Sequence, residues 1–257
     1  MSKILVTGSS KGIGRAIAGE LARRGHEVVA TARRVDTLAD LPVAHRVALD
    51  VTDDASVARA RAEVGPVDVL VNNAGDIVVA PLESTPIADA RGLYDVNVLG
   101  TLRMIQAFAP AMRERGSGTI VNMSSIVGRT GRPLTGVYSS TKWAIEGLSE
   151  ALRLELGHFG VRVIVIEPGK IDSGALDNPR RYFRAGDPYL PLAAQQRRGE
   201  MSPVGAVARA VADAIAAPAP AFRWPVGEDA VDLLAARARL DDPAFDVHLR
   251  SSLGFVW

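Results

Sequence analysis

The stretch TGSSKGIG, from Thr7 to Gly14, decides the fold, because it directly follows the apolar run KILV that begins at Lys3. Glycines permit a tight turn and let backbone amides approach a pyrophosphate, and the following helix offers unpaired N–H groups. The spacing is G-x-x-x-G-x-G rather than G-x-G-x-x-G, so a glycine-rich turn without a ligand is the alternative. The residues predicted to line this phosphate cradle are Gly8, Ser10, Lys11, Gly12, Ile13 and Gly14.

Short apolar runs recur along the chain and are apolar at consecutive positions, as in strands that are covered on both faces. Helical patterns lie between them: one runs from Gly12 to Gly25, and another is predicted to begin with Thr52 as its cap and Asp53 and Asp54 in its first turn. The runs are KILVTG at Lys3, EVVATA at Glu27, HRVALD at His45, VDVLVNNAG at Val67, GTIVNMSS at Gly118 and VRVIVIEPG at Val161; the final stretch from Phe222, which begins FRWPV, resembles a last strand followed by a helix and is counted with them.

This alternation predicts an α/β fold, a single doubly wound Rossmann-type domain over residues 1–257. Its sheet is expected to be mostly parallel and seven-stranded, one strand for each run quoted above, with helices on both faces. Ligands of such sheets bind beyond the carboxyl ends of the strands, so the loops after each strand are the informative ones.

Composition excludes several classes of function. The chain has 257 residues, a net charge of +1 and no cysteine, so disulfides, thiolate zinc sites and cysteine nucleophiles are excluded. The balanced charge gives no reason to expect nucleic acid as a partner. The apolar run Ile4–Val6 is too short for a signal peptide, and no membrane span is predicted, so we expect a cytoplasmic protein. The four histidines have no ligand-like spacing, so no metal site is predicted.

The end of the second predicted strand reads TARR, where an acidic residue would bind the ribose of NAD. Arg33 suits a 2′-phosphate instead, and Lys11 could add a second positive charge. The pair favours NADP(H) over NAD(H). Solvated surface cations are the alternative, and Asp36 would favour NAD if the strand ended later.

From Lys3 to Ser173 the sequence resembles the short-chain dehydrogenase/reductase family. The resemblance implies an NAD(P)-dependent oxidoreductase that needs no metal, usually a homodimer or homotetramer. The motifs that carry it, in order, are TGSSKGIG, NNAG at Asn72–Gly75, Asn97 in NVLG, a serine pair ending at Ser125, YSSTK at Tyr138–Lys142 and PG at Pro168–Gly169.

Tyr138 and Lys142 make chemical sense as an acid–base pair. Four positions apart on a helix, they lie on one face. An ammonium about 5 Å from a phenol stabilises the phenolate by roughly 3 kcal/mol, which would lower the tyrosine pKa by about two units toward neutrality. In isolation, the alternative is a packing tyrosine and a solvated lysine. The resemblance implies that Lys142 also binds the nicotinamide ribose, that Ser125 rather than Ser124 binds the substrate oxygen, and that Asn97 holds a water.

Other site residues follow from the resemblance alone. Asp50, with Val51, would lie near the adenine, although Asp50 reads nearly as well as a turn aspartate. NNAG would line the cleft or serve mainly to hold the central strand. The remaining predicted cofactor contacts are Asn73, Ala74, Gly75, Pro168, Gly169, Ile171 and Ser173.

Residues 170–202 are predicted to form a loop and helix that cover the substrate. The basic cluster RRYFR at Arg180 reads as the solvated face of a helix, with contact to an acidic substrate as the alternative, and Trp143 reads as core or subunit interface. The function expected is hydride transfer between NADP(H) and a lipophilic carbonyl compound or secondary alcohol. A catalytically silent NADP-binding regulatory protein, an NAD-preferring alcohol dehydrogenase and an enoyl reductase are the alternatives. The apolar residues of the segment are Leu176, Tyr182, Phe183, Tyr189 and Leu190.

Overall fold

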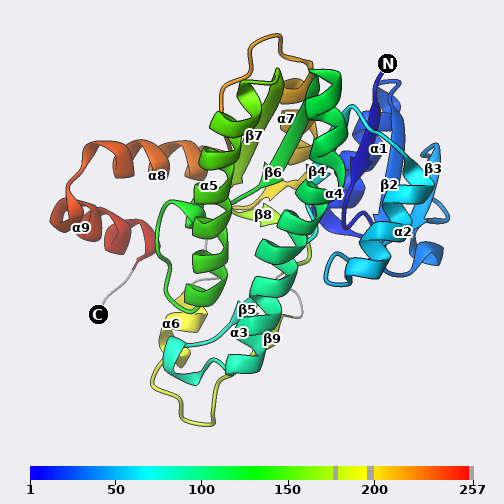
Figure 1. Ribbon diagram of the computed structural model, residues 1–257. Helices are drawn as coiled ribbons and strands as arrows, with labels where there is room; N and C mark the ends of the chain where they lie inside the picture. Colours follow the sequence, from blue (N-terminus) through cyan, green and yellow to red (C-terminus); the bar gives the residue numbers. More distant parts are fainter. Residues whose placement is uncertain (176–178, 196–199, 255–257) are drawn as a thin grey trace.

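A seven-stranded parallel sheet forms the centre of the molecule in the computed structural model, which describes residues 1–175, 179–195 and 200–254 (Figure 1). The strand order is β11-β7-β6-β4-β1-β2-β3, and every neighbouring pair runs parallel. The predicted fold class is confirmed. The strands are β1 (Lys3–Val6), β2 (Glu27–Ala32), β3 (His45–Ala48), β4 (Val69–Asn72), β6 (Gly118–Met123), β7 (Val161–Pro168) and β11 (Arg223–Val226).

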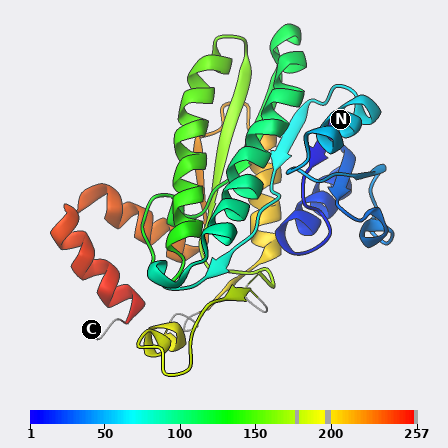
Figure 2. The ribbon, with the colours of Figure 1, turned by 60° about the horizontal axis from the view of Figure 1, so that its bottom comes forward.

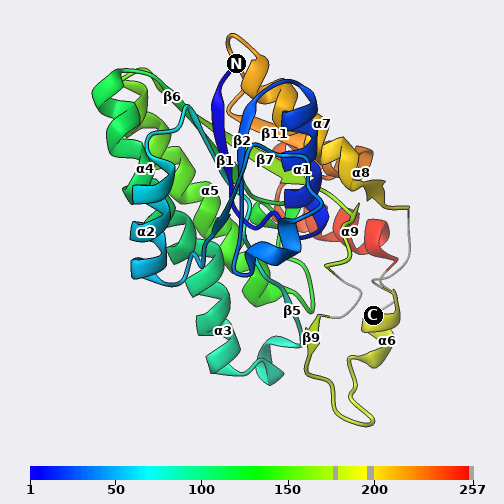
Figure 3. The ribbon, with the colours of Figure 1, turned by 90° about the vertical axis from the view of Figure 1, so that its right-hand side faces the viewer.

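Helices cover both faces of this sheet, with α1 and α7 on one side and α2, α4 and α5 on the other (Figure 3). This explains the continuous apolar strands, because burial on two sides leaves no polar face. Only β3, at the sheet edge, is mostly exposed. The helices are α1 (Gly12–Arg23), α2 (Asp54–Val64), α3 (Ile87–Tyr94), α4 (Gly100–Arg115), α5 (Gly136–Gly157), α6 (Leu190–Gln195), α7 (Val204–Ala216), α8 (Glu228–Arg239) and α9 (Asp242–Leu253).

The start of α2 corrects one prediction. Asp53, not Thr52, caps this helix, since the Asp53 side chain accepts from the Ala55 amide. The Thr52 hydroxyl is turned toward Asp50. The expected end of α1 is confirmed: Gly25 follows the helix in the left-handed region at φ +83°.

Short elements gather at the carboxyl ends of the strands, at the bottom of Figure 1 and toward the viewer in Figure 2. Two small strand pairs, β5 with β9 and β8 with β10, tie the segment after β7 to the rest of the molecule. These elements are β5 (Val78–Val79), β8 (Ile171–Asp172), β9 (Arg180–Arg181), β10 (Ser202–Pro203) and the single-turn segments η1 (Val35–Leu38), η2 (Leu82–Ser84), η3 (Asp95–Leu99) and η4 (Ile126–Gly128).

One prediction outside the sheet is wrong. RRYFR does not form a helix face, because Arg180 and Arg181 form strand β9, and Arg180 bonds to Asp76 and Asp89. Of the two readings of Trp143, the core is excluded because 48% of its surface is exposed in this chain, and a subunit interface stays a prediction. Among the described helices, none is long and apolar enough to cross a membrane.

Candidate active site

The glycine loop between β1 and α1 is packed so closely that larger residues would collide with it. Gly8 and Gly12 lie at φ +69° and +56°, where residues with a Cβ are strained. A Cβ on Gly14 would lie 2.3 Å from both Asn73 Nδ2 and the Gly8 carbonyl oxygen. One on Gly12 would lie 2.7 Å from the Ser173 carbonyl oxygen. The loop is therefore pressed between the segments that follow β4 and β7.

Asn73 and Thr7 hold this loop in place. Asn73 Nδ2 donates to the carbonyl oxygens of Thr7 at 2.9 Å and Gly8 at 3.2 Å. The Thr7 hydroxyl accepts from the amides of Asn73 and Ala74, each at 2.9 Å. The NNAG motif therefore fastens the loop to β4, close to the structural alternative considered from the sequence. Gly75, its last residue, lies against Asn97, whose Oδ1 would be 3.2 Å from an added Cβ.

The start of α1 fits a dinucleotide pyrophosphate. Its N-cap, Lys11, forms no side-chain cap, so the amides of the first turn, including Gly12 and Ile13, receive no side-chain acceptor there. Uncapped amides at a helix N-terminus are suited to a phosphate. Ser9 is buried and donates to Val6, which leaves Ser10 as the half-exposed serine of the loop.

Beside this loop, β2 ends at Ala32 as the sequence predicts, and the cations that follow it have different roles. Arg34 forms an ion pair with Asp36 at 3.1 Å. Asp36 therefore lies beyond the strand end, where an acidic residue would bind the ribose of NAD, and it pairs with a neighbouring cation. Lys11 and Arg33 are exposed and form no side-chain hydrogen bond or ion pair with any described residue. Both remain available to an anionic ligand.

Asp50 is a turn aspartate in this structure. Its Oδ1 accepts from the Thr52 amide at 2.9 Å and the Thr52 hydroxyl at 2.7 Å. Burial raises the Asp50 pKa, but the bonds from Thr52 and the nearby Arg33 charge outweigh it and hold the pKa below its ordinary value. Val51, beside it, is buried against Gly100 of α4.

The chain after β7 returns toward the glycine loop. The Pro168 carbonyl accepts from the Ser125 hydroxyl at 3.2 Å, and Gly169 donates to Val226 of β11 at 2.9 Å. Ile171 lies in β8, partly buried against the core beneath α1. Together with Ser173, whose carbonyl faces Gly12, these residues bring the end of β7 into the same neighbourhood as the phosphate cradle.

Ser125, Tyr138 and Lys142 come together at the ends of β6 and β7. Tyr138 forms a side-chain hydrogen bond with Ser125, and the Lys142 ammonium lies 5.7 Å from the centre of the Tyr138 ring. Lys142 is only 6% exposed, and its Nζ donates to the Met123 carbonyl at 2.7 Å. The Ser124 hydroxyl, by contrast, is buried without a hydrogen-bond partner among the described residues.

The pKa of Tyr138 is displaced in the direction opposite to the prediction. Burial raises the Tyr138 pKa to about 12, opposed by the Ser125 hydrogen bond, and the expected lowering by Lys142 is not found. Burial also lowers the Lys142 pKa to about 8, opposed by Glu146. The predicted net direction of the Tyr138 pKa shift was wrong because the argument left out the cost of removing the phenolate from water, which is the largest cause of the shift.

Asn97 lies on η3, a π-helical turn between α3 and α4, and is buried. Its Nδ2 donates to the Asp76 carbonyl and to the Thr141 hydroxyl, both at 3.0 Å, and its Oδ1 accepts from the Asp76 amide at 2.8 Å. Asn97 therefore joins the segment after NNAG to the helix turn that carries Tyr138 and Lys142.

The sequence reasoning missed charged residues around this group. Glu146 lies one turn after Lys142, a spacing visible in the sequence, and Glu167 directly precedes Pro168. Arg132, in the loop before Tyr138, has a buried Nε without a hydrogen-bond partner among the described residues. Burial lowers the Arg132 pKa, opposed by Asp229. No sequence signal distinguishes Arg132 from a surface arginine.

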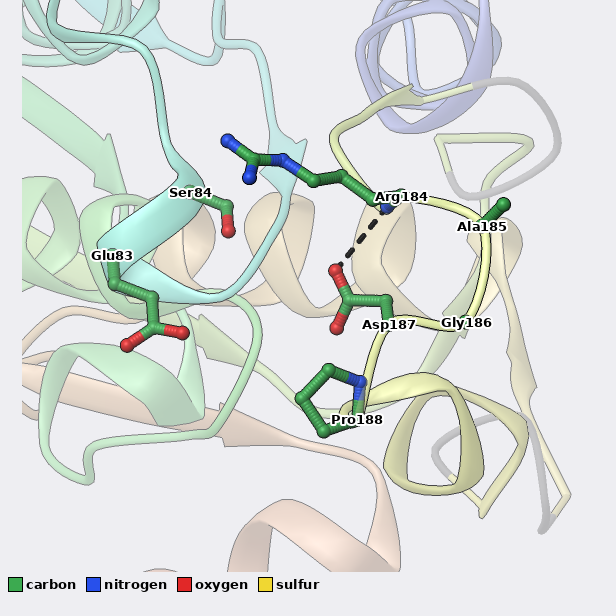
Figure 4. Close-up of a pocket in the computed structure, with 7 residues that line it drawn as sticks. All are labelled: Glu83, Ser84, Arg184, Ala185, Gly186, Asp187 and Pro188. Atoms are coloured by element: carbon green, nitrogen blue, oxygen red, sulfur yellow. Dashed lines mark hydrogen bonds between the residues drawn. The ribbon is translucent and has the colours of Figure 1, made fainter.

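The predicted substrate segment packs its aromatic residues inward. Tyr182 contacts a small cluster around Leu93, while Phe183 and Tyr189 contact one around Leu134. Leu190 is 43% exposed, and Leu176 lies outside the described residues. A cavity of about 330 Å³ lies between η2 and this segment, and Figure 4 shows Arg184 extending across it toward Ser84. Its lining residues include none of the predicted site residues, so it marks the edge of the segment.

No group of three or more histidine or acidic side chains placed to hold a metal ion occurs in residues 1–175, 179–195 and 200–254. The site is thus built from a glycine loop, a half-buried tyrosine beside a buried lysine, and the backbone after β7.

Known proteins share this arrangement and the sequence behind it. Human 17-beta-hydroxysteroid dehydrogenase type 1 is 37% identical over 269 residues, which covers 94% of this chain and 81% of the relative. Sorbitol dehydrogenase of Cereibacter sphaeroides is 39% identical over 217 residues, covering 80% of this chain and 84% of its own. The solved structure of a short chain dehydrogenase from Burkholderia cenocepacia in complex with NADP superposes with a TM-score of 0.81 at 29% identity, covering 98% of this chain and 97% of that one.

A family model described as short chain dehydrogenase matches residues 2–181, which span the glycine loop, NNAG, YSSTK and the end of β7. These segments converge at one edge of the sheet. The chain therefore belongs to the short-chain dehydrogenase family of oxidoreductases.

Proposed function

We propose that the protein transfers a hydride between NADP(H) and a carbonyl compound or secondary alcohol, with Tyr138 as the general acid and base. The observation that carries this proposal is the group at the ends of β6 and β7, where the half-buried Tyr138 is hydrogen-bonded to Ser125 and lies beside the buried Lys142 ammonium. A protein that only bound a dinucleotide would have no need of a buried lysine beside this tyrosine, since burying an ammonium is costly.

Each polar group has a role in the proton transfer. NADPH, when bound, would supply the hydride. The Tyr138 hydroxyl would then give its proton to the substrate oxygen, which gains negative charge. The Ser125 hydroxyl donates a hydrogen bond to that oxygen, as donors placed toward developing charge do. The Lys142 ammonium stabilises the resulting phenolate. Because burial raises the Tyr138 pKa to about 12, the phenol is protonated before hydride transfer and can give its proton to the substrate oxygen.

The choice of NADP(H) over NAD(H) rests on Lys11 and Arg33, which are exposed beside the glycine loop and bond to no described side chain. Both could pair with a 2′-phosphate. Solved members of the family carry NADP, among them the Burkholderia cenocepacia protein and a serine dehydrogenase. Gly8, Ser10, Gly12, Ile13 and Gly14 would hold the pyrophosphate.

For the substrate we infer a lipophilic carbonyl compound or alcohol. Tyr182, Phe183 and Tyr189 pack against the protein but are only half-buried, so part of their aromatic surface is left on the segment that would cover the substrate. The name of the human relative refers to a hydroxysteroid, which is a lipophilic secondary alcohol. We also propose a homodimer or homotetramer, which the family resemblance supports. A cytoplasmic location is proposed because the chain has no cysteine, which fits a reducing compartment.

The test is a panel of carbonyl compounds and alcohols assayed with NADPH and with NADH. The panel should contain matched pairs, a steroid ketone with its alcohol, a short aliphatic ketone, and a keto acid with its methyl ester to detect any contribution of Arg132. We expect turnover with NADPH on apolar members. Turnover only with NADH would favour the NAD-preferring alternative, and tight NADPH binding without turnover would favour a silent NADP-binding regulatory protein.

A further inference from the structure

Charged side chains from several elements meet in the interior behind Lys142. Glu146 lies on α5, Glu167 at the end of β7 and Arg223 on β11, while Arg129 follows η4. Glu146 and Glu167 are 5% and 1% exposed, so both carboxyl groups are removed from water. Burying carboxylates is costly, which calls for a reason beyond stability.

The arginines leave part of this negative charge unmatched. Arg223 Nε donates to Glu146 Oε2 at 2.8 Å, but Glu146 Oε1 is buried without a hydrogen-bond partner in the described part of the chain. Glu167 Oε1 lies 3.4 Å from Arg129 Nη1 and 3.8 Å from Arg223 Nε. Glu150, one turn after Glu146, also pairs with Arg223, but its side chain is 60% exposed.

Lys142 is a buried cation that lacks a carboxylate in direct contact. Its ammonium is buried and donates to the Met123 carbonyl, and it forms no ion pair within 4.0 Å of any described carboxylate. Glu146 follows it by four positions on α5, a spacing that places the two side chains on one face of the helix. The Glu146 carboxylate therefore acts on Lys142 through space, across a dry interior that screens it weakly.

We propose that Glu146, supported by Glu167, is a positioning residue that keeps Lys142 protonated beside Tyr138. This rests on the proposed function of Lys142, whose positive charge stabilises the phenolate. Burial favours the neutral form of Lys142, and the negative charge of the carboxylates favours its protonated form. The pKa values agree in direction, because burial lowers that of Lys142 to about 8 and Glu146 opposes the fall.

The second buried carboxyl group of this cluster belongs to Glu167. Burial, and then the Glu146 charge, raise the Glu167 pKa to about 7, and Arg129 and Arg223 oppose them. Glu167 thus titrates within the pH range of the experiment and, once ionised, would add its charge to that of Glu146. Of the remaining groups, the Tyr138 ring lies beside Lys142, the exposed Glu150 shares Arg223 with Glu146, and the uncharged Ser124 hydroxyl lies close to Gly128.

The experiment is an NMR titration of lysine labelled with ¹³C at its ε-carbon, in the full chain without cofactor or substrate. The lysines are Lys3, Lys11, Lys142 and Lys170, so the spectrum is simple, and the Lys142→Met variant identifies the resonance. A carboxylate one helical turn away in a weakly screened interior changes a pKa by roughly one to two units. We expect the Lys142 pKa to fall by about that amount in Glu146→Gln.

The matched control is Glu150→Gln, which removes a carboxylate from the same helix and the same arginine. Because Glu150 is exposed, its removal should shift the Lys142 pKa by less than about half a unit. Glu146→Asp keeps the charge and should retain most of the wild-type value. Equal Lys142 pKa values in wild type and Glu146→Gln, or equal shifts in Glu146→Gln and Glu150→Gln, would overturn the proposal.

The wild-type protein offers a second reading should Glu146→Gln not fold. The Lys142 resonance should show a small inflection near the Glu167 pKa of about 7, and this should be absent in Glu167→Gln. An inflection that persists in that variant contradicts the proposed support. Since no turnover is measured, loss of the proposed oxidoreductase function and loss of the charge coupling are separate results. If turnover is found, the alkaline limb of the rate profile should move to lower pH with the Lys142 pKa in Glu146→Gln.

Discussion

The phosphate end and the reacting end of the candidate site are built in opposite ways. Around the glycine loop, backbone and neutral side chains carry the structure, and an added Cβ at Gly14 would collide with Asn73 and Gly8. Around Tyr138 and Lys142 the structure consists of buried ionisable groups, several of which have displaced pKa values. The first region depends on shape, whereas the second depends on charge held in a dry interior.

This contrast predicts two kinds of sensitivity. A change of volume should damage the phosphate end and leave the reacting end intact, while a change of charge without a change of volume should do the reverse. Packing in protein interiors leaves little free space, and a buried charge responds to each neighbour because screening is weak. The four predictions below test this division.

Tyr138→Phe should produce the largest effect. It removes the proposed proton donor and the hydrogen bond to Ser125 while it preserves the ring. We expect turnover to fall roughly 10³-fold, within the range for general acid–base catalysis, with NADPH affinity nearly unchanged. Stopped-flow hydride transfer and fluorescence titration measure the two. Retained turnover would refute the mechanism, and a large loss of NADPH binding would show that the two ends are not separable.

Gly14→Ala should damage the phosphate end by volume alone. Its Cβ would come within 2.3 Å of Asn73 Nδ2 and the Gly8 carbonyl, so the loop must shift. We expect the free energy of unfolding to fall by about 1–3 kcal/mol and the NADPH dissociation constant to rise at least about tenfold. Urea denaturation and fluorescence titration provide these values.

Gly19→Ala is the matched control on the same helix, where an added Cβ meets nothing within 4 Å. It should raise the free energy of unfolding by about 0.5–1 kcal/mol through the better helix propensity of alanine. If both alanine variants lose NADPH affinity alike, close packing of the glycine loop is not the cause.

Glu167→Gln should act on charge without changing volume. The folded-state pKa of about 7 lies above the ordinary 4.5, so the folded protein binds more protons than the unfolded chain between these values. The contribution of Glu167 to stability is therefore present below pH 4.5 and lost as pH rises to 7. At pH 8 we expect the variant to be more stable than wild type by about 1–2 kcal/mol, and nearly equal at pH 4. Thermal unfolding at both pH values checks the sign, and a variant less stable at pH 8 contradicts it.

Arg33→Ala should give the smallest effect, confined to the exposed rim of the phosphate end. We expect NADPH binding to weaken about fivefold to tenfold while NADH binding stays unchanged, because only a 2′-phosphate contact is removed. Arg34→Ala removes a cation already paired with Asp36 and is the control. Equal losses for both cofactors in Arg33→Ala would show that Arg33 does not select between them.

Much of the fold was readable in the sequence because it depends on local pattern. Consecutive apolar residues predicted the buried parallel strands, and glycines marked the first turn and the end of α1. Errors arose where several local signals competed. Thr52 and Asp53 both suit a helix cap, and the choice of Asp53 followed from where the turn at Asp50 placed the backbone. RRYFR lacked any signal of its partner, because β5 lies far away in the chain.

The sequence by itself determined the class of sheet, the order of the motifs and the pairing of Tyr138 with Lys142 on one helix face, because each follows from short-range spacing. Only the tertiary structure decided the charges. It buried Lys142 beside the half-buried Tyr138, placed Glu146 and Glu167 in the interior near the lysine and fixed Asn73 onto the glycine loop. Desolvation and long-range contacts depend on which segments meet in space, and no spacing along the chain encodes them.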